Sequence, residues 1–320
     1  MRKGIIKGLK TFSGHIVRSV ISNIPVSFYN DHYFEQGVSL TILTKNDPWF
    51  AESLVSVYTY ADEIIIIDSS DETDYINYNR LIIDKLRKKV DIKYYSEDIR
   101  ITQARRKAKE ESSREIIVHW DADMIAIEDG PSCLGQIIDE VKSVKVKKVV
   151  YFPLLTPYYV LSRVTTYPLD IEGWIFSNTS KELYRPRSGD PKSEKFVEGF
   201  SPPKYFKRIA YNSVAGVHMK YMMPSDKALY KKYEGYLLND KFMEKFGNYD
   251  TLKRQLPNYS ADAEPSWGEY DEHIHGKYPV LLRRFFGLSL SEIVKVKIDE
   301  IKNLVIPKEV QEKIDSSRGD

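Results

Sequence analysis

A run of four isoleucines, residues 64–67, constrains the fold of this chain more than any other segment. Both faces of a strand with this composition are apolar, because successive side chains point to opposite sides of a sheet. Such a strand is stable where helices cover the sheet on both sides, as they do in parallel sheets of α/β proteins. The sequence therefore predicts an α/β fold with this strand in the middle of the sheet.

The segments around this run alternate between strand and helix patterns. Strands are predicted at 38–43, 63–67, 90–95, 115–120 and 147–152, helices at 48–59, 78–88 and 101–112, and a packed amphipathic helix at 293–305. The first helix is expected to begin at Pro48, after a capping Asp47. Alternating elements with short connections imply parallel strands with right-handed crossovers. The carboxyl ends of the strands are thus expected to share one edge.

Composition excludes several classes of protein. Hydrophobic residues make up 42% and charged residues 29%, and no apolar run reaches the roughly 18–20 residues of a spanning helix. The formal net charge is +2, which is too small for a dedicated nucleic-acid-binding protein. The single cysteine, Cys133, excludes an internal disulfide and indicates a reducing compartment. We therefore expect a cytoplasmic protein with no nucleic-acid partner.

The N-terminus differs in charge from the rest of the chain. Residues 1–30 hold five basic residues and no acidic one, and the remaining 43 basic and 46 acidic residues leave the body at −3. An amphipathic helix is predicted from apolar residues spaced three or four apart: Ile5, Leu9, Phe12, Ile16 and Val20. Residues 1–22 are expected to dock on the body or to fray, and peripheral contact with the inner face of a membrane is the alternative.

Three polar clusters follow predicted strands, at 44–46, 68–70 and 121–123. In open α/β sheets, ligands bind outside the carboxyl ends of the strands. The chain has neither G-x-G-x-x-G after the first strand nor G-x-x-x-x-G-K-[ST], which disfavours dinucleotide oxidoreductases and P-loop ATPases. The three clusters are therefore expected to line a crevice for another class of ligand.

Asp121 and Asp123 form the only D-x-D motif of the chain. Two carboxylates at the end of a buried strand are costly unless a cation neutralises them. Mg²⁺ or Mn²⁺ bound there keeps positions open for phosphate oxygens and water. The motif predicts a divalent cation that receives a diphosphate, and the alternative is an Asp that caps a following helix beside a solvated Asp.

The order and spacing of residues 38–46 (VSLTILTKN), 61–70 (ADEIIIIDSS) and 116–123 (IIVHWDAD) resemble glycosyltransferase family 2. The resemblance implies a GT-A fold over 37–225, which is Rossmann-like with a mostly parallel sheet and helices on both faces. An N-terminal extension (1–36) and a mainly helical C-terminal region (226–320) flank it. The resemblance also implies a Mn²⁺ or Mg²⁺ cofactor, a UDP- or GDP-sugar donor, and a glycan or lipid-linked hydroxyl acceptor.

The resemblance assigns roles to particular residues. The nucleotide sugar is expected at Thr44, Asn46, Asp68, Ser70, Gln103, Arg105 and Asp121. Looser matches at 183–185, 196–199 and 217–220 resemble lipopolysaccharide-type members of the family. They imply a cation held by Asp121, Asp123 and His218, and a base at Glu198, with Asp170 and Glu172 as reserves.

Each assignment has a plainer alternative. Arg105 fits a solvated helix face, Glu198 a surface carboxylate, and His218 a core histidine with a satisfied hydrogen bond. His119, inside the predicted strand, is expected to pack. For the whole chain, a metal-dependent, inverting glycosyltransferase is predicted. The alternatives are a sugar nucleotidyltransferase of similar fold and a non-catalytic, surface-bound scaffold.

Overall fold

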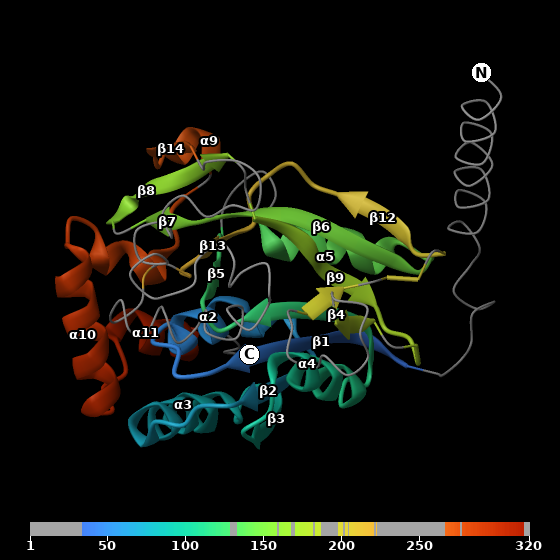
Figure 1. Cartoon of the computed structure of the whole chain (residues 1–320), viewed down its shortest axis with the longest axis horizontal. Helices are drawn as coiled ribbons and strands as arrows, with labels where there is room; N and C mark the ends of the chain where they lie inside the picture. The colour runs from blue at the N-terminus through green and yellow to red at the C-terminus, as the bar shows by residue number, and fades with distance from the viewer. Residues whose placement is uncertain are drawn as a thin grey trace, which may run out of the picture.

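The computed structural model describes residues 34–128, 133–158, 160–167, 170–181, 183–186, 198–200, 202–203, 205–220, 222, 266–275 and 277–316. The N-terminal helix predicted from residues 1–22 lies outside these ranges. For Asp170, Glu172 and Glu198 the structure describes the backbone alone. The described part is an α/β fold with a large central sheet, flanking helices and a helical C-terminal part, which confirms the predicted fold class (Figure 1).

The elements of the first half alternate as predicted. They are β1 (Glu35–Thr44), α2 (Phe50–Val57), η2 (Tyr58–Tyr60), β2 (Glu63–Asp68), α3 (Thr73–Leu86), β3 (Asp91–Ser96), α4 (Ile101–Glu110), β4 (Arg114–Asp121), β5 (Met124–Ala126), α5 (Leu134–Ser143) and β6 (Lys148–Leu155). The prediction that α2 begins at Pro48 is wrong by two residues. Asp47 Oδ1 accepts a hydrogen bond from Trp49 N at 3.0 Å, and this turn precedes the helix.

The second half contains shorter strands and the C-terminal helices. They are β7 (Pro157–Tyr158), β8 (Val160–Tyr167), β9 (Asp170–Ser177), β10 (Tyr184–Pro186), β11 (Glu198–Phe200), β12 (Lys207–Ala210), β13 (Gly216–His218), β14 (Ser266–Glu269), α9 (Glu272–His275), η4 (Val280–Phe285), α10 (Leu290–Lys302) and α11 (Lys308–Ser316). The helix predicted at 293–305 corresponds to α10, which ends at Lys302.

The central sheet has nine strands in the order β3-β2-β1-β4-β9-β6-β13-β5, with β12 beside β6. The pairs β2–β3, β1–β2 and β1–β4 are parallel, as expected. β9 departs from the expectation, because it runs antiparallel to both of its neighbours, β4 and β6. Since β6 is again parallel to β4 in direction, the carboxyl ends of β1, β2, β4 and β6 lie at one edge.

The isoleucine strand β2 is buried on both faces, as the sequence predicts. Ile64 and Ile66 belong to a core with residues of α2 and α3, whereas Ile65 and Ile67 pack in a separate core with residues of α4. All four are 0% exposed, and burying such a side chain stabilises a fold by about 1.5–3 kcal/mol. The strand therefore fixes which helices cover each face of the sheet.

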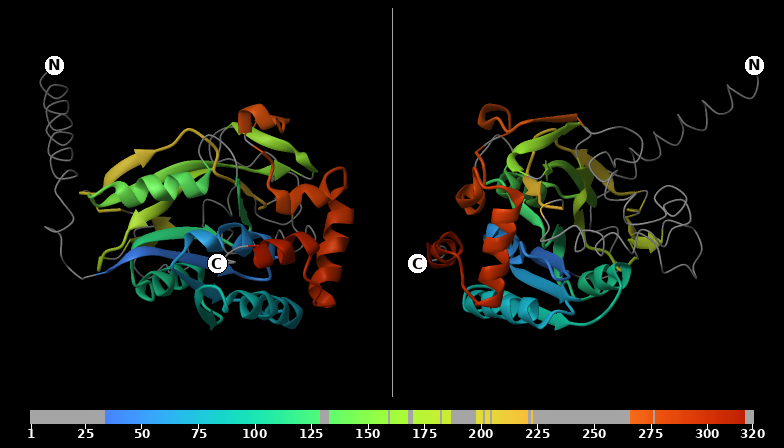
Figure 2. Two further views of the ribbon diagram at one scale, coloured as in Figure 1. Left: turned by 180° about the vertical axis from the view of Figure 1, so that it is seen from behind. Right: turned by 60° about the vertical axis from the view of Figure 1, so that its left-hand side comes forward.

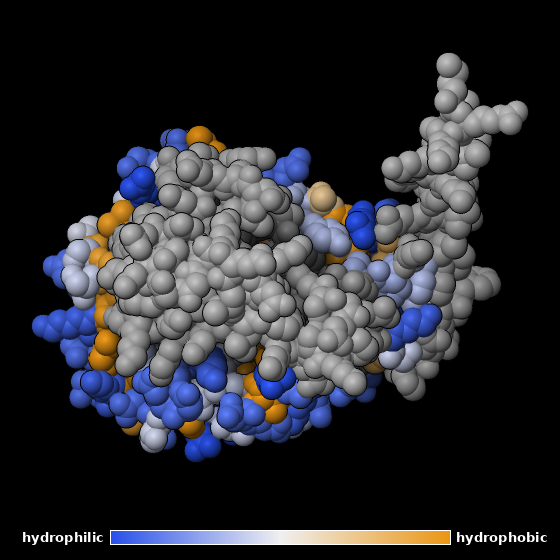
Figure 3. Space-filling view, viewed as in Figure 1, coloured by the Kyte–Doolittle hydropathy of each residue, from blue (hydrophilic) through white to orange (hydrophobic). Residues whose placement is uncertain are grey.

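The C-terminal helices pack beside α2 and α3 (Figures 1 and 2). Ile301 of α10, and Val310 and Ile314 of α11, join the same core as Ile64. The described surface is mostly hydrophilic in Figure 3, with apolar side chains along the side where Figure 1 shows α10. Among the described residues, no helix has both the length and the apolar character needed to cross a bilayer.

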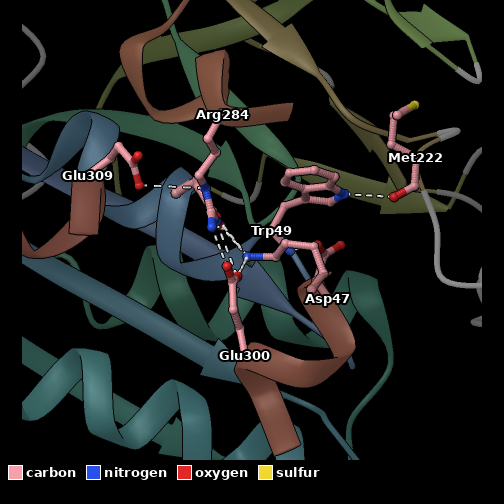
Figure 4. Close-up of polar contacts among 8 residues, drawn as sticks. Asp47, Trp49, Met222, Arg284, Glu300 and Glu309 are labelled. Carbon is pink, nitrogen blue, oxygen red and sulfur yellow. Dashed lines mark hydrogen bonds and ion pairs between the residues drawn. The ribbon is translucent and has the colours of Figure 1, made fainter. Parts of the chain in front are cut away.

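A buried ionic cluster attaches the C-terminal helices to α2 (Figure 4). Lys297 Nζ lies 2.7 Å from Glu52 Oε1 and 3.0 Å from Glu300 Oε2, and Lys297 and Glu52 are 1% and 0% exposed. Arg284 Nη2 donates to Glu52 Oε1 at 2.7 Å, and Arg284 also pairs with Glu300. Its Nε lies 3.8 Å from Glu309 Oε2. Each buried charge thus has an opposite charge at contact distance.

Removing one cation from this cluster leaves an uncompensated buried carboxylate. Lys297→Met is expected to lower the free energy of unfolding by about 3–5 kcal/mol, measured by urea titration. The control is Lys308→Met, because Lys308 pairs with Glu312 at 3.5 Å on the surface and is 82% exposed. Its change is expected to stay within about 0.5 kcal/mol. Equal changes in the two variants would contradict the importance of the cluster.

The cluster also makes stability depend on acid pH. Burial alone raises the pKa of Glu300, but Lys297 and Arg284 outweigh it and lower this pKa below its ordinary value of 4.5. The charged carboxylate therefore stabilises the fold above about pH 4.5, and this contribution is lost as the pH falls through the folded-state pKa. Below about pH 4.5, the free energy of unfolding is expected to fall less steeply with pH in Glu300→Gln than in the wild type. Parallel slopes would show that Glu300 does not contribute.

Candidate functional site

The three polar clusters predicted from the sequence lie together at the carboxyl edge of the sheet. β1 stands between β2 and β4, and its register pairs Thr44 with Asp68 and Leu43 with Asp121. Backbone bonds continue past the strand ends, from Ser69 N to Thr44 O at 2.9 Å and from Ala122 N to Leu43 O at 3.1 Å. The loops after three adjacent strands therefore form one continuous border.

Asn46 joins the loop after β1 to the loop after β2. Its backbone N donates to Ser70 Oγ at 2.9 Å, and its side-chain Oδ1 accepts from the backbone N atoms of Asp71 and Glu72, both at 3.2 Å. Its φ of 48° is in the left-handed region, which Asn tolerates better than most residues. The predicted ligand residues Asn46 and Ser70 thus shape the border through their bonds with each other.

Asp68 organises this border from inside and is not accessible to a ligand in this structure. The residue is 0% exposed. Its Oδ1 accepts from Ser70 N at 2.9 Å, and its Oδ2 accepts from Asn79 Nδ2 at 3.1 Å and Tyr94 Oη at 2.8 Å. These partners bury the carboxylate, and the direct nucleotide contact of Asp68 stays a prediction.

The D-x-D motif forms a tight turn between two strands. Asp121 is the last residue of β4, and Met124 begins β5. Ser53 Oγ of α2 donates to Asp121 O at 2.8 Å and fixes the start of the turn. The alternative expectation was an Asp that caps a following helix. A strand follows the motif instead, so neither Asp has this role. The turn places both carboxylates at the edge of the sheet.

Asp121 is held by groups from α4 and from its own strand. Arg105 Nη2 lies 3.2 Å from Asp121 Oδ2, and His119 Nε2 lies 3.4 Å from Asp121 Oδ1. Burial raises the pKa of Asp121, but nearby positive charge, that of Arg105 above all, outweighs it and keeps this pKa below its ordinary value. Burial, aided by Arg105, lowers the pKa of His119 to about 3, so the imidazole is neutral at pH 7.

Arg105 is buried, so the alternative of a solvated basic helix face does not hold. It is 3% exposed, and its Nη1 donates to His119 Nδ1 at 2.8 Å. Gln103, two residues earlier on α4, is exposed, and its Oε1 accepts from Arg100 N at 3.2 Å. Gln103 therefore caps the helix, and Arg105 provides the positive charge beside the D-x-D turn.

Asp123 and His218 meet although they are far apart in the sequence. β13 pairs antiparallel with β5, so His218 stands opposite Met124, and Met219 N donates to Asp123 O at 2.7 Å. His218 Nε2 then lies 3.3 Å from Asp123 Oδ2, and the two side chains are 16% and 3% exposed. Both groups also act electrostatically on Asp121. The imidazole and the two carboxylates thus share one site.

The donor atoms of Asp123 and His218 have a spacing that suits a shared metal ion. Two ligands bound at about 2.1 Å to one divalent ion keep their donor atoms roughly 3.0–3.4 Å apart, and the observed separation is 3.3 Å. Within the described residues, no group of three or more His, Cys, Asp or Glu side chains is placed to hold a metal. Asp123 and His218 are thus a pair of described side chains at the spacing of two ligands.

Thr44 carries an unexplained polar atom at the border. The residue is 5% exposed, and its Oγ1 has no hydrogen-bond partner in the described structure. A buried hydroxyl without a partner is uncommon in folded proteins and calls for a ligand or water. Asp170 and Glu172 belong to β9 and Glu198 to β11, but their side chains lie outside the described residues.

Sequence reasoning underestimated His119, which was expected only to pack. Its ring does pack against Trp174, with centroids 6.1 Å apart and planes at 10°. It also lies between Arg105 and Asp121. The signal was present in the sequence: residues 119 and 121 are two apart on one strand, and such side chains point to the same face.

Comparisons with known proteins give distant structural matches. No protein-family model and no curated protein matches the chain. A crystal structure of S. aureus TarS 1-349 matches with TM-score 0.39 and 12% identity, over 70% of this chain and 74% of that one. Another S. aureus TarS structure matches with TM-score 0.39 and 15% identity. The match covers 86% of this chain and 50% of that one.

HddC from Yersinia pseudotuberculosis matches with TM-score 0.35 and 13% identity, over 61% of this chain and 99% of that one. These TM-scores are too low to support any statement about this chain, so its fold and site rest on its own residues. Membership of glycosyltransferase family 2 remains an expectation from the sequence.

The link that Asn46 makes between the two loops can be tested with a pair of variants. Asn46→Gly and Asn46→Ala both remove the side-chain bonds to the second loop, which contribute about 1 kcal/mol each. Ala also pays the cost of the left-handed backbone, so it is expected to be less stable than Gly by about 1 kcal/mol. Thermal and urea unfolding measure both differences. Two variants as stable as the wild type would contradict the role of Asn46.

Proposed function

We propose that this protein is a glycosyltransferase that uses a nucleotide-sugar donor and a divalent cation. The observation that carries the proposal is the meeting of Asp123 and His218 at the carboxyl edge of the sheet, 3.3 Å apart and next to Asp121. Mn²⁺ or Mg²⁺ would be held by Asp123 and His218. When bound, the cation acts as a Lewis acid that stabilises the leaving diphosphate of the donor.

The other residues of the site bind and orient the donor. Asp121, 23% exposed at its side chain, is the accessible carboxylate for a ribose or sugar hydroxyl. The unpartnered Oγ1 of Thr44 and the loop joined by Asn46 and Ser70 suit the nucleotide end. Asp68 supports this loop from beneath. Arg105 holds Asp121 at 3.2 Å and favours its charged form. We therefore propose that Arg105 positions Asp121, whereas the sequence predicted a direct contact between Arg105 and the donor.

The transfer also needs a base that takes the proton of the acceptor hydroxyl as its oxygen attacks the anomeric carbon. Glu198 is the first candidate, and Asp170 and Glu172 are the reserves, all three on sequence grounds. The acceptor is proposed to be a glycan or a lipid-linked hydroxyl. The proposal includes contact of residues 1–22 with the inner face of a membrane. This part rests on the sequence, because these residues lie outside the described part of the chain.

The proposal predicts that a nucleoside diphosphate stabilises the protein together with Mn²⁺. UDP, GDP and dTDP are each added with Mn²⁺, and thermal unfolding is recorded. At a ligand concentration of 100 times the dissociation constant, stabilisation is expected to be about 2.7 kcal/mol. Asp123→Asn is expected to abolish the shift, because it removes the charge of a proposed ligand. Asp84→Asn, a change of an exposed acid on α3, is the matched control and keeps the shift.

Product analysis separates the remaining functions. Incubation with UDP-, GDP- and dTDP-sugars and Mn²⁺ is expected to release a nucleoside diphosphate. Formation of a nucleoside triphosphate and a sugar 1-phosphate when inorganic pyrophosphate is added to the same mixture would instead identify a sugar nucleotidyltransferase. Absence of both turnover and a thermal shift with every nucleotide would favour the scaffold and overturn the proposal.

A further inference from the structure

His119 lies at the centre of the candidate site, although the proposed function gives it no contact with donor or cation. Its side chain is 6% exposed, and its ring is held against Trp174 and edge-on to Tyr184, with centroids 6.1 and 6.2 Å away. These contacts fix the plane of the ring. Nδ1 then faces Arg105 and also Thr41, whose Oγ1 lies 3.3 Å away, and Nε2 faces Asp121.

The neighbours of His119 determine which nitrogen carries its hydrogen. Arg105 Nη1 lies 2.8 Å from Nδ1, and a guanidinium can only donate hydrogen bonds. Nδ1 is therefore an acceptor, and the hydrogen of the neutral ring is on Nε2. That atom lies 3.4 Å from Asp121 Oδ1 and has no hydrogen-bond partner within the described structure. Nε2 thus lies within ion-pair distance of the carboxylate without making a hydrogen bond to it.

Arg105 completes a closed triangle with His119 and Asp121. Its Nη2 donates to Asp121 Oδ2 at 3.2 Å, while its Nη1 donates to His119. One oxygen of Asp121 therefore faces Arg105, and the other faces His119. A carboxylate with partners on both oxygens cannot rotate freely about its terminal bond.

We propose that His119 is a positioning residue that orients Asp121 for the cation and donor by holding Asp121 through Nε2–H and Arg105 through Nδ1. This inference rests on the proposed function. The neutral ring adds no second positive charge beside Asp121, which already faces Arg105. A buried Lys or Arg at position 119 would place a further positive charge next to the proposed cation site.

Residues that hydrogen-bond to metal ligands typically change metal affinity by 10- to 100-fold when they are removed. His119 contacts Asp121, which is a neighbour of the proposed ligands Asp123 and His218. The effect of His119 must also act through Asp121. It is therefore expected to disappear when Asp121 no longer carries a charge, and a double-mutant cycle detects this dependence.

The tautomer is tested first, on the full chain without metal. Long-range nitrogen–proton NMR of the imidazole, assigned with His119→Phe, is expected to show the Nε2–H form at pH 7. Asp121→Asn is expected to shift the Nε2 resonance. An Nδ1–H ring, or a resonance that does not respond to Asp121→Asn, would overturn the proposal whether or not the protein binds a cation.

The consequence is tested with Mn²⁺ alone, by the loss of its free EPR signal. His119→Phe keeps an aromatic ring beside Trp174 and is expected to raise the Mn²⁺ dissociation constant about 10-fold. In the Asp121→Asn background the same change is expected to alter it by less than about twofold. Ile117→Ala is the control for loss of packing on the same strand, because Ile117 is 0% exposed. It is expected to lower the melting temperature and leave Mn²⁺ affinity unchanged.

The outcomes separate the two proposals. Failure of the wild-type protein to bind Mn²⁺ would overturn the proposed function and the role of His119 with it. Binding by the wild type, with an equal loss from His119→Phe in both backgrounds, would overturn only the role of His119. The same applies if His119→Phe and Ile117→Ala both lower the melting temperature and neither changes Mn²⁺ affinity. His119→Gln, which returns an N–H at the ε position, is expected to recover part of the affinity, and no recovery would also count against the contact with Asp121.

Discussion

Two carboxylates end a buried strand within one tight turn, and their charge must be balanced for β4 to occupy the middle of the sheet. Each carboxylate has its own arrangement. Asp121 faces Arg105 and a neutral His119, whereas Asp123 Oδ2 lies 3.3 Å from His218 Nε2. The first carboxylate is thus balanced by the protein itself. Asp123 is paired with His218, a residue type that can bind a metal ion together with a carboxylate. This difference between the two carboxylates distinguishes a candidate binding site from an ordinary strand end.

Much of the fold could be predicted because local patterns and tertiary structure agree. The isoleucine strand needed cover on both faces, and α2, α3 and α4 supply it. β9 could not be predicted as the antiparallel strand between β4 and β6, because the polar start of its sequence, DIEG, is not the pattern of a buried strand and its position follows only from the pairing with β4 and β6. The start of α2 was misplaced because Asp47 bonds to Trp49 N in a turn that precedes the helix.

The candidate site was predicted in part. The positions of the three loops followed from strand order, since parallel strands share an edge. The roles of single side chains did not follow. Asp68 is polar and at the edge, yet its bonds to Ser70, Asn79 and Tyr94 bury it, and sequence position does not reveal such partners. Arg105 likewise has a helix-surface pattern but lies inside, because Asp121 and His119 offer it acceptors.

The contact between Asp123 and His218 depends on backbone pairing between β5 and β13 and on the bond from Met219 N to Asp123 O. Within the stretch that separates the two residues in the chain, β6 also supports this contact, because it pairs with β13 at Gly216 and Val217. Insertions, deletions and sequence drift in α5 or the later hairpins can therefore accumulate during evolution without disturbing this pair. Distant relatives would keep the two residues in three dimensions while their spacing along the chain varies, so superposition of sites would recognise them where alignment of sequences does not.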